Sequence, residues 1–120
     1  MIWLDNALVV SPRLGFFKTA KAFRAAMREA KIPKKHRPDF LNPGANATTH
    51  WFNMDGVQHI MVCMPDSAET DAQKRGLLVH EAVHVVQHAM QMMGEDRPGN
   101  EIEAYAVQRI SLALWEAAGL

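Results

Sequence analysis

The segment His80-Glu81-Ala82-Val83-His84 has the spacing of a metal-binding helix. Side chains four residues apart lie above one another on a helix, so the two imidazoles can both reach one metal ion at ~2.0–2.1 Å. Glu81 lies one residue along from His80, close enough to contact a water molecule at the metal without ligating the metal itself. These residues predict a Zn²⁺ site with the carboxylate of Glu81 beside a metal-bound water.

A zinc site of the catalytic type needs a third protein ligand and an open position for water. His88 lies four residues beyond His84, but the helix rise puts it about 12 Å from His80, so one ion cannot bind both. Met90 and Gln87 stand where the metzincin pattern has its third histidine and its glycine, which excludes that subclass. The third ligand must therefore come from another part of the chain.

Glu101 and Glu103 are the two candidates for this third ligand. They follow a turn-rich segment, residues 94–100, which is long enough for the chain to reverse and return a carboxylate to the level of His84. Each glutamate also has a structural interpretation. Glu103 could form a capping box with Asn100, and Glu101 could be an acid favoured by the helix dipole in the first turn.

Two helices are expected to carry these side chains. Thr70, with Gln73 three residues later, predicts a capping box at a helix start, and Gly94 is a typical residue at a helix end. We therefore expect the helix with both histidines at about 71–93. A last helix is expected at about 99–118.

The first half of the chain predicts a strand, a helix and a hairpin. Ile2–Val10 is a strand candidate, and apolar residues at three- and four-residue intervals predict a helix at about 15–31. Alternation at about 48–64, interrupted by Asp55-Gly56, predicts a β-hairpin. One face of this hairpin is expected to hold Phe52, Met54, Val57, His59 and Met61, and the other face Trp51 and Ile60. These elements together indicate an α+β fold.

Composition limits the class of protein. The 120 residues suit one domain, and 48% apolar with 22% charged residues is ordinary for a globular chain. Cys63 is the only cysteine, which excludes an internal disulfide, fits a reducing, cytoplasmic compartment and suggests a small buried side chain. His59 is likewise expected to be structural. No apolar run approaches the ~20 residues of a membrane span, and residues 1–14 lack the basic start of a signal peptide.

The segment GLLVHEAVHVVQ, residues 76–87, followed by Glu101-Ile102-Glu103-Ala104-Tyr105, resembles the gluzincin metallopeptidases. The short length is similar to that of minigluzincins and of small zincin-like proteins from phage and prophage genomes. The resemblance covers roughly residues 48–118. It implies a minimal zincin-like fold, in which the hairpin belongs to a sheet over the active-site helix, and zinc-dependent hydrolysis of peptide bonds.

The resemblance also implies roles for single residues. His80, His84 and Glu101 would bind Zn²⁺, because the family's ligand glutamate precedes a small residue by three positions, as Glu101 precedes Ala104. Glu81 would take a proton from the attacking water and give it to the leaving amine. Tyr105 stands where the family usually has an aspartate that orients a ligating histidine. Its hydroxyl could orient a ligand or stabilise an oxyanion, or its ring could simply pack between helices.

Two other functions are compatible with the sequence. The first is a catalytically silent zincin-like domain that binds a protein partner, because 120 residues leave no room for a large second lobe. The second is nucleic-acid binding. Residues 11–37 contain nine basic residues and one acidic residue, whereas residues 38–103 contain three basic and ten acidic residues. The expected basic stripe, more often a solvated helix face, consists of Lys18, Lys21, Arg24, Arg28 and Lys31.

Overall fold

A four-stranded mixed sheet carries three helices in the computed structural model, which describes residues 2–4, 12–95 and 97–120. The strand order is β1-β2-β4-β3; β2 and β4 are parallel, and the other two pairs are antiparallel. The α+β prediction is confirmed. In chain order the elements are β1 (Ile2–Trp3), β2 (Arg13–Phe17), α1 (Ala20–Glu29), a short 3₁₀ helix (Lys34–His36), β3 (Thr48–Met54), β4 (Val57–Cys63), α2 (Asp71–Met92) and α3 (Asn100–Ala118).

The predicted hairpin is confirmed in position and register. Asp55 and Gly56 both have positive φ, 52° and 81°, which is the conformation that a two-residue hairpin turn requires. Phe52 pairs with His59, and Trp51 pairs with Ile60, so the two predicted faces of the hairpin are the observed ones. β3 is the outermost strand on this side of the sheet.

The helix predicted at about 15–31 is present, but it begins five residues later than predicted. Phe16 and Phe17 belong to β2, where they alternate between the two faces of the sheet, and the helix begins only after Thr19. The Thr19 hydroxyl accepts a hydrogen bond from the Ala22 amide and so acts as the N-cap. The chain passes from period two to period 3.6 within a few residues, and the apolar spacing alone did not reveal this change.

Gly15 allows β1 to pack closely against β2. A Cβ at this position would lie 2.8 Å from the Trp3 ring, so only glycine leaves room for the indole. Only Ile2–Trp3 of the strand expected at Ile2–Val10 forms a described strand, and residues 5–10 lie outside the described part of the chain.

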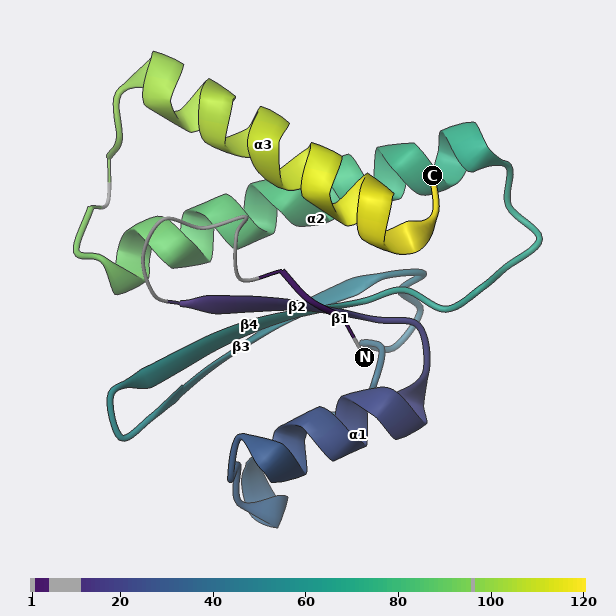
Figure 1. Cartoon of the computed structure of the whole chain (residues 1–120), viewed down its shortest axis with the longest axis vertical. Helices are drawn as coiled ribbons and strands as arrows, with labels where there is room; N and C mark the ends of the chain where they lie inside the picture. The colour runs from purple at the N-terminus through teal and green to yellow at the C-terminus, as the bar shows by residue number, and fades with distance from the viewer. Residues whose placement is uncertain (1, 5–11, 96) are drawn as a thin grey trace.

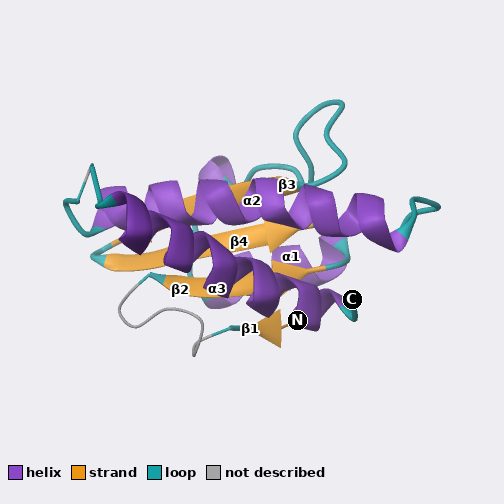
Figure 2. Cartoon of the chain, turned by 90° about the horizontal axis from the view of Figure 1, so that it is seen from above, coloured by secondary structure: helices purple, strands orange, loops and turns teal. Residues whose placement is uncertain are grey.

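The helices lie on opposite faces of the sheet (Figure 1). α2 and α3 cover one face and α1 covers the other, which gives three layers. Seen from above, α2 lies over β3 and β4, and α3 lies beside it over β2 (Figure 2). Among the described residues, no helix is long and apolar enough to cross a membrane.

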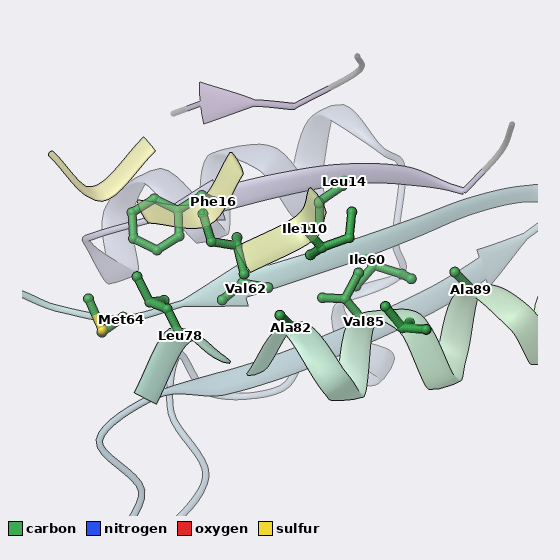
Figure 3. Packing of buried hydrophobic residues seen from close by; sticks show 12 residues of the cluster. Leu14, Phe16, Ile60, Val62, Met64, Leu78, Ala82, Val85, Ala89 and Ile110 are labelled. Carbon is green, nitrogen blue, oxygen red and sulfur yellow. The ribbon is translucent and has the colours of Figure 1, made fainter. Parts of the chain in front are cut away.

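The larger core fixes the rotation of α2 about its axis. Leu78, Ala82, Val85 and Ala89 project from α2 toward Ile60 and the neighbouring strands (Figure 3). These apolar side chains recur every three or four residues and are buried against the sheet. Both histidines of the motif lie between a third and a half of a turn away from these positions and are consequently directed away from this core.

The start of α2 has the predicted capping box, whereas the start of α3 has none. The capping box of Thr70 and Gln73 is confirmed, with hydrogen bonds of 2.9 and 3.2 Å. α3 begins one residue earlier than a cap at Asn100 would require, because Gly99 is the N-cap and no side chain caps this end. Asn100 and Glu103 therefore do not form a capping box.

Candidate metal centre

The two imidazoles of the motif converge. His80 Nε2 and His84 Nε2 lie 3.2 Å apart, and the ring centroids are 4.8 Å apart at 77°. Two nitrogen ligands at ~2.0–2.1 Å from one tetrahedral ion lie ~3.3–3.4 Å from each other. The distance between the two nitrogens therefore fits two ligands of one zinc ion.

Gln87 holds the ring of His84. With the proton on Nδ1, the imidazole donates a hydrogen bond to Gln87 Oε1 at 3.3 Å, and the lone pair of Nε2 lies on the side that faces His80, where a metal ion would bind. In the gluzincins that the motif resembles, an aspartate after the glutamate motif has this orienting task. In this chain a side chain one turn along α2 can provide the same support.

Glu81 is fixed by a contact between β3 and α2. Its side chain is only 4% exposed, and Oε1 accepts a hydrogen bond of 3.1 Å from the hydroxyl of Thr49. A buried carboxylate needs such a donor, because burial removes the water that would otherwise solvate it. Thr49 was not among the site residues predicted from the sequence. The only available signal was the hairpin alternation, which puts Thr49 on the same face as Trp51.

An open cleft of about 1140 Å³ contains the motif. One wall is the polar side of α2 and the other is formed by residues 42–49 and Trp51. His80, Glu81 and His84 line the cleft near its middle, so a ligand in the cleft reaches all three side chains. The site therefore combines two convergent nitrogen donors, a held carboxylate and open access.

His88 lies one turn beyond the histidine pair and contacts Trp51. The two rings are stacked with centroids 3.6 Å apart at 22°. Burial, with a smaller contribution from the neighbouring His84, lowers the pKa of His88, so its imidazole is neutral at pH 7. His88 is thus in contact with β3 one turn beyond the histidine pair.

The residues predicted on α3 lie away from this cleft. Glu101 is exposed in the first turn of α3, and Glu103 lines a separate hollow with Val79 and Val107. Tyr105 is 67% exposed and lines another hollow that includes Ile2. Within residues 2–4, 12–95 and 97–120, no three His, Cys, Asp or Glu side chains are grouped closely enough to hold a metal ion. The structure thus brings two of the three expected ligands together.

Among the residues that the structure describes, three further titratable side chains are buried outside the cleft. His50 stacks on Phe23 and donates a hydrogen bond of 2.9 Å from Nε2 to the carbonyl of Phe40. Burial lowers the pKa values of His50 and His59, the latter helped by the nearby Arg13 charge, and burial raises the pKa of the Cys63 thiol. Cys63 is fully buried, as expected, and the His59 ring lies beside Trp3 in the sheet.

Comparisons with protein-family models, with curated proteins and with solved structures find no match to this chain. The function of the protein is therefore inferred from the geometry of the cleft and from the motif itself.

Proposed function

We propose that this protein is a zinc-dependent metallopeptidase with a minimal zincin-like fold. The observation that carries the proposal is the 3.2 Å separation of His80 Nε2 and His84 Nε2 above an open cleft. The adjacent carboxylate of Glu81 adds the proton acceptor that hydrolysis needs. β3 is the outermost described strand on its side of the sheet and its first half lines the same cleft, so an extended peptide could pair with its edge.

Each side chain of the cleft has a task in this reaction. His80 and His84 would hold Zn²⁺, which when bound polarises a peptide carbonyl and makes water a better nucleophile at neutral pH. Glu81 accepts the proton of the attacking water and delivers it to the nitrogen of the leaving amine. Thr49 keeps the carboxylate of Glu81 in place through its 3.1 Å hydrogen bond, and Gln87 orients His84.

The third protein ligand is assigned by the family resemblance rather than by the cleft. Glu101 is exposed on α3, so its ligation requires the first turn of α3 to approach the histidine pair. Glu103 is the alternative ligand from the same turn. Metal loading would then tighten the packing between α2 and α3, and a zinc titration can detect this in the thermal stability of the protein.

Hydrolysis of a denatured protein by the purified chain tests the proposal. We expect cleavage that a chelator abolishes and that added zinc restores. Glu81→Gln should abolish cleavage while the protein still binds zinc, and Glu95→Gln, at an exposed glutamate outside the cleft, should have no effect. If zinc is bound and biological activity survives Glu81→Gln, the protein is instead a silent zincin-like binding module.

The exposed face of α1 favours nucleic-acid binding as a second function. All five predicted basic side chains are exposed, and α1 lies on the face of the sheet opposite α2 (Figure 1). One of them, Lys18, lies 3.9 Å from Asp66. The two large apolar residues of α1, Phe23 and Met27, are buried, so this face offers charge without large apolar side chains that could insert into a membrane. Duplex DNA binding that weakens steeply with salt, and that is lost on reversing the charges of Lys21, Arg24 and Arg28, would support this function.

A further inference from the structure

The cleft is long enough for several residues of an extended peptide. It follows α2 from Gln73 to beyond His88, and these two residues are fifteen positions apart. At ~1.5 Å of helix rise per residue this is ~22 Å, the length of about seven residues of extended chain. The histidine pair lies between the two ends, so a bound peptide would extend past the pair on both sides.

One end of the cleft is aromatic. Trp51 is 53% exposed although it stacks on His88, so part of the indole remains open to solvent beside the cleft. The stack fixes the orientation of the indole before any ligand arrives. An aromatic or large apolar side chain can cover the open part of the ring and remove apolar surface from water.

The other end of the cleft is acidic. Glu69 is half-buried beside Gln73 in the cleft lining, and in the described part of the chain no ion pair engages its carboxylate. The only charged residues among the described lining are Glu69 and Glu81; neither lysine nor arginine is present there. A lysine or arginine side chain would therefore meet an unneutralised carboxylate at this end.

We infer that the cleft selects extended peptides that carry an aromatic or large apolar side chain and, about six or seven residues away, a basic side chain. The first packs on the Trp51–His88 stack, and the second pairs with Glu69. The peptide bond to be cleaved lies between them, next to the histidine pair. This inference rests on the proposed peptidase function and names its substrate class.

Binding to the uncleaving Glu81→Gln protein tests this specificity. Four fluorescent decapeptides would differ only at two positions seven residues apart: Trp or Ala at one, Lys or Glu at the other. We expect the Trp/Lys peptide to bind about tenfold more tightly than either singly changed peptide. A reversed Trp/Lys order serves to find the direction in which the peptide lies.

Variants at Trp51 and Glu69, which lie at the two ends of the cleft, test the two preferences separately. In the Glu81→Gln background, Trp51→Ala should remove the preference for tryptophan and leave the preference for lysine. Trp51→Phe should restore the first preference, and Glu69→Lys should reverse the second. Val57→Ala, at an exposed apolar residue of the same hairpin, and Glu95→Lys, at an exposed acid outside the cleft, are the matched controls.

The possible failures are distinguishable. Equal binding of all four peptides, or preferences that Trp51→Ala and Glu69→Lys leave unchanged, would overturn the inference even if wild-type protein cleaves peptides. Selective binding without any zinc-dependent cleavage by wild-type protein would overturn the peptidase proposal and leave a selective peptide-binding groove.

Discussion

α2 and α3 lie side by side on one face of the sheet, yet they present their ionisable side chains very differently. On α2, His80 and His84 point into one cleft and their Nε2 atoms converge to 3.2 Å. On α3, Glu101 and Glu103 are exposed outside this cleft. The first arrangement follows from a four-residue spacing within one helix. The second depends on how two helices cross, which apolar packing decides.

The packing of α3 explains this difference. Ile110 and Leu114 are buried in the core shared with α2, and the indole of Trp115 donates a hydrogen bond of 3.2 Å to the carbonyl of Arg75. These contacts hold the second half of α3, whereas Ile102 in its first turn is 63% exposed. The end of α3 that carries the glutamates is thus the less restrained end, and it is the end that would have to move to complete a metal site.

The largest difference between α2 and α3 is expected in zinc affinity when Glu101 and Glu103 are replaced one at a time. If the first turn of α3 supplies the third ligand, Glu101→Gln should weaken zinc binding by at least about 100-fold, because loss of even an outer partner costs 10–100-fold. Glu103→Gln should change the affinity little. Competition with a chromophoric chelator measures both values. Unchanged affinity in both variants would remove α3 from the metal site.

The hydrogen bond between Thr49 of β3 and Glu81 of α2 can be tested by replacing Thr49. Thr49→Val removes the hydroxyl that donates to Glu81, and a hydrogen bond to a charged group is worth about 1.5 kcal/mol, or roughly tenfold. We expect kcat to fall by about this factor with KM unchanged, since the carboxylate is still present but poorly oriented. Thr49→Ser should restore kcat. A change confined to KM would instead assign Thr49 to substrate binding.

The smallest expected effect is on the pH dependence of stability. It comes from His50 and His59, the buried histidines of the hairpin, and it can be measured without zinc. Burial lowers the pKa values of His50 and His59, so below pH 6.5 the unfolded chain takes up more protons than the folded chain. Stability should therefore be lost as the pH falls from 6.5, by at most about 1.4 kcal/mol per pH unit for each histidine.

Urea unfolding of the chelated protein at pH 7.5 and pH 5 measures this loss. His59→Leu should reduce the difference between the two pH values, whereas His36→Gln, at an exposed histidine on the 3₁₀ helix, should not. Equal stability of the wild-type protein at both pH values would contradict the assignment.

Local patterns in the sequence predicted much of the fold. The capping box at Thr70, the positive-φ turn at Asp55-Gly56 and the faces of the hairpin are all encoded within a few residues, and all three are confirmed. β2 was missed because its five residues directly precede a helix with compatible apolar spacing. β2 pairs in parallel with β4, whose paired residues come more than forty positions later in the chain, and pairing over such a separation leaves no local sequence pattern.

In the candidate site, too, some features follow from local sequence and others depend on tertiary packing. The convergence of His80 and His84 follows from helix geometry, so the sequence was sufficient to predict it. The hydrogen bond from Thr49 to Glu81 and the stack of Trp51 on His88 join residues more than thirty positions apart. Such contacts depend on the tertiary packing of β3 against α2, which no short spacing encodes.

Metal analysis of matched histidine variants determines whether His80 and His84 bind one zinc ion. The wild-type protein, stripped and reloaded, should hold one zinc ion per chain. His84→Ala should lose it, and His88→Ala, at the next histidine along the same face of α2, should retain it. Zinc bound equally by wild type and by His84→Ala, or by neither, would contradict the account.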